Sequence, residues 1–337
     1  MSEEKSLSVF EKYLAVWVAV CMGVGLVLSQ TLPGLSIALN NWQIRGVSVP
    51  IGICLFLMMY PALLNVQIDE IKKLMRNPKP IFLTLFSNWI VAPLVTLYLA
   101  RYFLTGYDQL IVSLVLLGSS PCTAMVLVWG SLADGNQEQN IINTSLNTVT
   151  IIFLYAPIVS LLTGIQNIPI DRGLLVLSVA VFIGAPMVIG YLSKRYLIGT
   201  RGDAWFNGTY RPLIGKISII ALLTTLIVLF SLNGDALITN PDLMVLISAP
   251  LLIGFVVVVG FNLIITKMFG LAYNEAIISV IIGSSSHFEI AIATAIALYG
   301  VGSQAALGTT MGLFWEVPIM LGLVSLGKYL NKNKFWG

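Results

Sequence analysis

The feature that most constrains this chain is a series of ten apolar runs separated by short polar breaks. Each run is close to the 20 or so apolar residues that a helix needs to cross a bilayer. Hydrophobic residues make up 57% of the sequence and charged residues 10%, against about 25% charged in soluble domains. A water-soluble fold would lack the polar groups to cover its surface. We predict membrane spans at residues 13–31, 47–67, 80–103, 109–132, 141–164, 173–193, 213–232, 243–266, 276–299 and 305–327.

The basic residues predict an orientation for these spans. Each span must satisfy its own backbone hydrogen bonds in lipid, so it is a helix, and ten spans put both termini on one side. With the termini in the cytoplasm, only Arg45, Arg101 and Arg172 of the 18 Lys and Arg lie outside. The other fifteen lie inside, as the positive-inside rule requires: Lys5, Lys12, Lys72, Lys73, Arg76, Lys79, Lys194, Arg195, Arg201, Arg211, Lys216, Lys267, Lys328, Lys332 and Lys334. We predict a multi-pass protein of the plasma or inner membrane.

Charge and cysteine usage exclude other classes of protein. The net charge is +3 and the basic residues are scattered, so the chain is not expected to bind nucleic acid. Three cysteines, all inside apolar runs, do not indicate a disulfide framework. We expect membrane lipids as the surroundings and no cofactor.

An internal repeat divides the chain into halves. Residues 118–122 (Gly-Ser-Ser-Pro-Cys) in the fourth span match residues 283–287 (Gly-Ser-Ser-Ser-His) in the ninth. Ala-Pro-Leu occurs at 92–94 and again at 249–251, and Pro-Ile at 157–158 and 318–319, in the same order. We therefore predict two five-helix repeats, residues 1–168 and 169–337, within one membrane domain.

Five spans per repeat make the second copy inverted, because an odd number of crossings reverses the direction of entry. Secondary transporters use this plan, and their interrupted helices expose backbone to the substrate near the midplane. Pro121 removes a helical N–H, so the fourth and ninth spans are predicted to be discontinuous. The alternative is that these Gly and Ser residues only let helices pack closely.

Two acidic residues lie deep in apolar runs, Glu289 and Glu316. Such groups face a protein cavity or stay neutral, because burial in lipid disfavours a charge. We favour Glu289, one turn past the second break, as a proton carrier. For Glu316, beside Pro318, an inter-helix hydrogen bond is the favoured interpretation.

The candidate substrate-binding residues surround the two breaks. Cys122 follows Pro121 at the start of a half-helix, where the helix dipole favours a thiolate, whereas Cys21 and Cys54 have the pattern of small buried hydrophobes. His287 is the only histidine, and it is either functional or a hydrogen-bonding filler at the break. The predicted binding set is Cys122, Glu289, Ser119, Ser120, Ser285 and His287, with supporting roles for Pro121, Glu316, Asn88 and Asn147.

From the second to the tenth span the sequence resembles the arsenical-resistance-three family of arsenite efflux permeases, in the bile acid/sodium symporter superfamily. The resemblance rests on 121–126 (Pro-Cys-Thr-Ala-Met-Val) with 128–129 (Val-Trp), and on 288–293 (Phe-Glu-Ile-Ala-Ile-Ala) with 295–297 (Ala-Ile-Ala). Residues 58–61, 88–89 and 316–318 also match the family pattern. One departure is that Ser286 and His287 stand where the family has amides.

This resemblance implies a ten-helix fold of inverted repeats, with a panel of helices beside a core that holds the crossed, broken helices. It implies export of trivalent arsenite or antimonite from the cytoplasm by proton antiport. Cys122 would contact the metalloid substrate, and Glu289 would carry the proton. A single thiolate suits a carrier, because three converging thiolates would hold a thiophilic metalloid too tightly to release it.

Two other functions compete with arsenite export. A sodium-coupled organic-anion symporter would need acidic and amide ligands for Na⁺ around the break, where this chain has mostly serine. An intramembrane hydrolase would use Ser285, His287 and Glu289, but these lie too close along one segment for catalytic geometry, and no oxyanion motif accompanies them. We therefore expect a transporter and not an enzyme.

Overall fold

The computed structural model describes residues 14–32, 34, 38, 41–44, 47–64, 78–123 and 125–336. It is helical apart from one antiparallel pair, β1 (Gln43–Ile44) and β2 (Val47–Ser48), in which Gln43 is opposite Ser48. The predicted all-helical class is thus confirmed. Six residues of the charge assignment lie outside the described residues, namely Lys5, Lys12, Arg45, Lys72, Lys73 and Arg76.

Helices account for nearly every described segment. In chain order they are α2 (Leu14–Thr31), α4 (Val49–Leu64), α5 (Pro78–Phe86), the π-helix η2 (Ser87–Val91), α6 (Ala92–Phe103), α7 (Asp108–Gly118), α8 (Met125–Leu132), α9 (Gln137–Ile165), α10 (Arg172–Val179), the π-helix η3 (Ala180–Gly184), α11 (Ala185–Arg201), α12 (Asp203–Trp205), the π-helix η4 (Phe206–Tyr210), α13 (Arg211–Thr239), α14 (Pro241–Met268), α15 (Tyr273–Ser284), α16 (Phe288–Tyr299) and α17 (Gln304–Lys332).

Several helices extend beyond the predicted spans. The predicted span 141–164 becomes α9, which starts four residues earlier because the Asn136 side chain accepts a hydrogen bond from the Gln139 N–H (3.2 Å) and caps the helix. Six stretches of the described chain are long and apolar enough to cross a membrane, and these are Pro78–Phe103, Gln137–Ile165, Arg172–Arg201, Asp203–Thr239, Pro241–Met268 and Gln304–Lys332. The count of ten spans stays a prediction.

Each of the three π-helices precedes a proline. Pro93, Pro186 and Pro212 each follow two residues after the end of η2, η3 and η4 respectively. A proline has no N–H and its ring clashes with the carbonyl four residues earlier. The helix widens locally to avoid that clash. In η2 the widening places two neighbouring polar residues, Ser87 and Asn88, inside the bundle.

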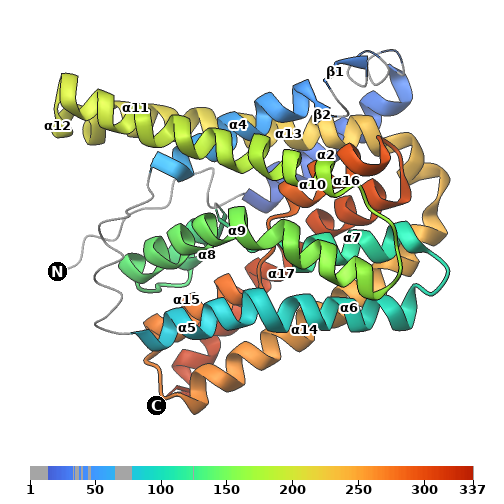
Figure 1. Ribbon diagram of the computed structural model, residues 1–337. Coiled ribbons are helices and arrows are strands. Elements are labelled where there is room, and N and C mark those ends of the chain that lie inside the picture. The colour runs from blue at the N-terminus through green and yellow to red at the C-terminus, as the bar shows by residue number, and fades with distance from the viewer. Residues whose placement is uncertain are drawn as a thin grey trace.

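The helices form two groups (Figure 1). In the first helix group α13 packs against α2 and α4, and α4 packs against α11. In the second helix group α7, α14 and α16 pack against α17, and α6 packs against α7 and α14. The first group also includes α10, which continues through η3 into α11, and the second includes α9. The two groups meet where α10 contacts α9 and α16 and where α13 contacts α17. The second group also contains α8 and α15. The predicted breaks lie between α7 and α8 and between α15 and α16, so this group holds the candidate site.

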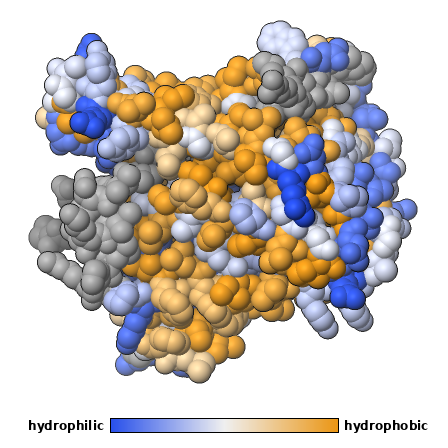
Figure 2. Space-filling view, viewed as in Figure 1, coloured by the Kyte–Doolittle hydropathy of each residue, from blue (hydrophilic) through white to orange (hydrophobic). Residues whose placement is uncertain are grey.

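The outer surface is apolar where a membrane would surround it. Figure 2 shows hydrophobic residues over the middle of the face, with hydrophilic residues mostly toward two opposite ends. Large apolar side chains are exposed on this surface, including Val245 (73% exposed) and Val256 (72% exposed) on α14. Exposed apolar patches of this extent mark a surface that lies against lipid.

Candidate functional site

The site is the place where two unwound segments pass each other antiparallel. The first lies between the end of α7 at Gly118 and the start of α8 at Met125, and the second lies between the end of α15 at Ser284 and the start of α16 at Phe288. Pro121 and Ser286 form an isolated antiparallel bridge. Both predicted helix breaks are therefore present, and we call this place the crossing.

The two segments satisfy each other's backbone groups. The Cys122 N–H donates to the Ser285 carbonyl (3.3 Å), and the His287 N–H donates to the Ser120 carbonyl (2.6 Å). Unwinding a helix inside a membrane protein is tolerated when the freed groups find partners in this way. Pro121, at the centre of the bridge, has no N–H that would need one.

Small residues let neighbouring helices approach the crossing. A Cβ at Gly118 would clash with the Thr96 side chain on α6, and a Cβ at Gly283 would come within 2.9 Å of Asn262 Oδ1 on α14. The glycines of the repeated motif therefore have a packing role, as the alternative interpretation proposed, in addition to their position at the breaks.

Two asparagines on neighbouring helices support the first unwound segment. The Asn147 amide nitrogen donates to the Cys122 carbonyl (3.2 Å), and Asn147 Oδ1 accepts from the Asn88 amide nitrogen (3.1 Å). Cys122 itself is 1% exposed, while Asn88 and Asn147 are also buried. The structure thus joins three residues that the sequence singled out separately, from η2, α9 and the unwound segment.

A carboxylate holds the second segment. Glu316 Oε1, on α17, accepts from the Ser285 hydroxyl (2.6 Å) and from the Ser286 N–H (3.0 Å), and Oε2 pairs with the Ser286 hydroxyl. This is the inter-helix hydrogen bonding that the sequence favoured for Glu316. Because Ser285 donates to Glu316 and not to a histidine, a Ser-His-acid catalytic arrangement is not formed at these residues.

His287 and Glu289 form a buried pair. His287 Nε2 lies 3.5 Å from Glu289 Oε2, and His287 Nδ1 lies 3.2 Å from the Thr123 hydroxyl. Both residues are at most 1% exposed, and neither His287 Nε2 nor Glu289 Oε1 has a hydrogen-bond partner among the described residues. At 3.5 Å the imidazole and the carboxyl are neighbours without a hydrogen bond, and a small approach would let a proton pass between them. The sequence did not predict a role for Thr123, although this residue directly follows Cys122 in the Pro-Cys-Thr-Ala-Met-Val motif.

The two remaining predicted serines differ. The Ser120 hydroxyl donates to the Leu117 carbonyl (3.0 Å), which closes the last turn of α7. The Ser119 hydroxyl is fully buried and has no partner within the described chain.

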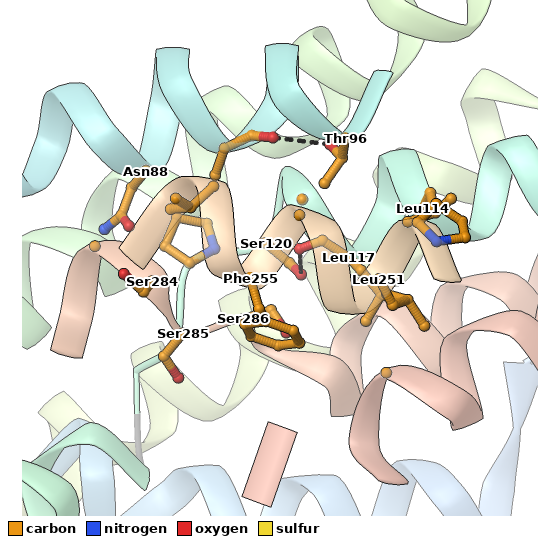
Figure 3. Close-up of a pocket in the computed structure, with 18 residues that line it drawn as sticks. Asn88, Thr96, Leu114, Leu117, Ser120, Leu251, Phe255, Ser284, Ser285 and Ser286 are labelled. Carbon is orange, nitrogen blue, oxygen red and sulfur yellow. Dashed lines mark hydrogen bonds between the residues drawn. The ribbon is translucent and has the colours of Figure 1, made fainter. Parts of the chain in front are cut away.

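A small cavity adjoins the crossing between α6 and α14 (Figure 3). Its volume is about 60 Å³, and Asn88, Ser120 and Ser284 to Ser286 line it together with apolar residues such as Phe255. Cys122, His287 and Glu289 do not line it. Pockets for drug-sized ligands measure about 300–1,000 Å³, so this cavity suits a molecule of only a few atoms.

Comparison with known proteins identifies the family. The profile of the sodium bile acid symporter family matches residues 52–240. The chain is 38% identical to an uncharacterized transporter of Synechocystis, over 98% of this chain and 91% of the relative. It is 34% identical to the arsenical-resistance protein Acr3 of Alkaliphilus metalliredigens (99% and 96% covered) and 30% identical to that of Corynebacterium glutamicum (98% and 91%).

These matches confirm the resemblance found in the motifs. They extend it over nearly the whole chain, including the first predicted span. The Synechocystis relative is named a transporter and the matching family is named for symporters, which agrees with the prediction that the chain is not an enzyme. The chain belongs to the sodium bile acid symporter family and is a multi-pass membrane transporter.

Proposed function

We propose that this protein exports trivalent arsenite from the cytoplasm, and antimonite by the same chemistry. The observation that carries the proposal is the full-length similarity to two arsenical-resistance proteins. The cavity of about 60 Å³ beside the crossing agrees with a substrate of only a few atoms; Cys122 lies next to the cavity residue Pro121 and does not itself line the cavity. The test is uptake of arsenite into everted membrane vesicles, in which an exporter accumulates its substrate; vesicles without the protein provide the control.

We further propose that Cys122 is the ligand of the metalloid. Arsenic and antimony are thiophilic, and soft thiolates select soft ions. In support, Cys122 lies at the crossing, whereas Cys21 and Cys54 lie in α2 and α4 of the first helix group. The thiolate would exchange with one hydroxide of the substrate, and that exchange is reversible because a single sulfur is involved.

Glu289 is proposed to carry the coupled proton. Arsenite enters as a neutral hydroxide, so a proton gradient can drive its export only if a protein group changes charge during the cycle. Glu289 is a buried carboxyl with one unpartnered oxygen among the described residues, and it touches His287. An alternating-access movement would expose this pair to one side of the membrane after the other.

The arrangement proposed in the membrane is ten spans in two inverted repeats, 1–168 and 169–337, with both termini in the cytoplasm. The two interrupted helices, half a chain apart, support this arrangement. Single cysteines in a cysteine-free chain test it. Arg201→Cys and Lys332→Cys should react with an impermeant thiol reagent only from the cytoplasm, and Thr105→Cys and Asp171→Cys only from outside. Labelling of all four from one side would contradict the arrangement.

Sodium coupling is the competing mechanism, since the family is named for sodium symporters. The vesicle assay separates the two. Accumulation that follows an imposed pH gradient in sodium-free buffer supports proton antiport. Accumulation that requires a sodium gradient would replace the proton in this proposal and leave arsenite as the substrate.

A further inference from the structure

The first half of α9 presents buried polar side chains on one face of the helix. Positions 139/140, 143/144 and 147 are one turn apart, so they lie along one stripe. We call this stripe the α9 polar face, and its members are Gln139, Asn140, Asn143, Thr144 and Asn147, which are at most 9% exposed. The stripe leads from the α8–α9 turn to the crossing.

Neighbouring helices bond the nitrogen atoms of this face. The Asn143 amide nitrogen donates to the Thr84 hydroxyl on α5 (3.0 Å), and the Asn140 amide nitrogen donates to the Val126 carbonyl on α8 (3.2 Å). Gly130 makes room for the second contact, because a Cβ there would collide with the Asn140 amide. The amide nitrogens of the face are therefore satisfied by protein.

Three oxygen atoms of the same face have no such partner. Asn140 Oδ1, Asn143 Oδ1 and Thr144 Oγ1 have no hydrogen-bond partner in the described chain, although these residues are 0%, 1% and 5% exposed. Buried polar atoms are nearly always bonded to protein or to ordered water. Polar residues that merely join helices would pair their donors with acceptors. Here two amide oxygens and one hydroxyl within two turns remain for water.

The far end of the face reaches the proton-carrying pair. Asn147 donates to the Cys122 carbonyl (3.2 Å), and the next residue, Thr123, places its hydroxyl 3.2 Å from His287 Nδ1. The other ring nitrogen of His287 lies 3.5 Å from Glu289. Glu316, the other carboxyl at the crossing, is held by Ser285 and Ser286. Polar groups thus continue from the α8–α9 turn to Glu289.

We propose that a file of water molecules runs along the α9 polar face and connects the end of the bundle at the α8–α9 turn with the His287–Glu289 pair. Its use as the proton path of transport rests on the proposed function, whereas the water file itself does not. In such a transfer, a proton added to His287 Nδ1 would be matched by one passed from Nε2 to the Glu289 carboxylate, once the two groups close the 3.5 Å between them. This file gives the buried pair access to one side of the membrane while the crossing stays packed.

Deuterium exchange tests the water file without any transport. In a chain with Cys21, Cys54 and Cys122 replaced by serine, Thr144→Cys places a thiol on the face. Ser145→Cys is the matched control, because Ser145 is 3% exposed and its hydroxyl donates to the Ile141 carbonyl within its own helix (2.8 Å). In D₂O the infrared S–H band of Thr144→Cys should convert to S–D much faster than that of Ser145→Cys. Equal rates would overturn the proposal.

Transport measurements test the use of the file. Thr144→Val, which keeps the shape and removes the hydroxyl, should lower arsenite accumulation under a pH gradient several-fold relative to arsenite–arsenite exchange. Thr144→Ser should restore the ratio, and Ser145→Ala should leave it as in the parent. A ratio unchanged by Thr144→Val refutes the proton path. If the parent does not respond to a pH gradient, the proposed coupling fails, while the deuterium result still decides the water file.

Discussion

The two unwound segments at the crossing share a geometry and differ in chemistry. Each interrupts a helix of the second group, and each donates one backbone N–H to the other. The first is held by neutral amides, Asn147 and Asn88, whereas the second is held by the carboxyl group of Glu316. The first carries the thiol of Cys122, and the second leads into the His287–Glu289 pair.

This difference indicates a division of tasks. Amides do not titrate near neutral pH, so the segment with the thiol keeps the same support whatever the pH. The histidine and the two carboxyl groups of the crossing lie at the second segment, where a change of charge can alter the packing of α16 and α17. The substrate ligand would then lie on one segment and the proton carrier on the other, and two backbone hydrogen bonds would couple them. Substitutions in the two segments should therefore affect different steps of transport.

The largest expected effect is at Cys122. In cells without other arsenite exporters, Cys122→Ser should abolish resistance, because a hydroxyl does not bind the metalloid as a thiolate does. Cys21→Ser and Cys54→Ser should retain resistance, since both residues lie in the first helix group. Growth on arsenite, with protein amount checked by immunoblot, is the measurement. If Cys21→Ser or Cys54→Ser abolishes resistance while Cys122→Ser retains it, the assignment of Cys122 as the ligand is wrong.

The second segment should respond differently to substitution. Glu289→Gln keeps the shape and fixes the charge, so it should abolish accumulation against a gradient in everted vesicles. His287→Asn, which restores an amide at this position, should be tolerated. Arsenite binding to Cys122 should survive in both variants, as measured by quenching of Trp129 and the other tryptophans. If Glu289→Gln still accumulates arsenite and His287→Asn does not, the proton belongs to the histidine.

Glu316 and Asn147, which support the second and the first unwound segment, should differ in their contribution to stability. Glu316→Leu leaves the Ser286 N–H and two hydroxyls without their acceptor, which costs about 2–5 kcal/mol. Asn147→Leu leaves one carbonyl and one amide unpaired, which costs about 1–3 kcal/mol. Thermal unfolding in detergent should therefore show the larger drop in Tm for Glu316→Leu. The reverse order would mean that the first segment depends on its support more than the second.

Much of this site was predictable from local chemistry. The breaks follow from Pro121 and from the repeated Gly-Ser motif, and the importance of Asn88 and Glu316 follows from the cost of polar groups in lipid. Each of these signals lies within a few neighbouring residues. The same holds for the π-helices, since the positions of Pro93, Pro186 and Pro212 are visible in the sequence.

The partners of these residues could not be predicted. Glu316 bonds Ser286 across 30 residues, and His287 meets Thr123 across 164. Contacts at such separations depend on how the helices pack, which no periodicity within one span encodes. The grouping of the helices has the same origin. The apolar stripe of a membrane helix does not say whether it faces lipid or protein, because both are apolar.

The smallest expected effects are at two neighbours in η2 that support opposite segments. The Asn88 amide donates to Asn147 behind Cys122, whereas the Ser87 hydroxyl donates to the Gly283 carbonyl at the end of α15 (2.8 Å). The π-turn allows adjacent residues to reach both segments. Asn88→Ala and Ser87→Ala should each lower stability by about 0.5–1.5 kcal/mol.

Their effects on transport should nevertheless differ. Asn88→Ala loosens the support of Cys122, so it should raise the arsenite concentration needed for half-maximal transport and leave its pH dependence unchanged. Ser87→Ala loosens the segment that leads to Glu289, so it should shift the pH dependence and leave the arsenite requirement unchanged. Vesicle transport at several arsenite concentrations and pH values measures both. If the two variants change the same parameter, then the crossing responds as one unit and the separation of substrate ligand from proton carrier does not hold.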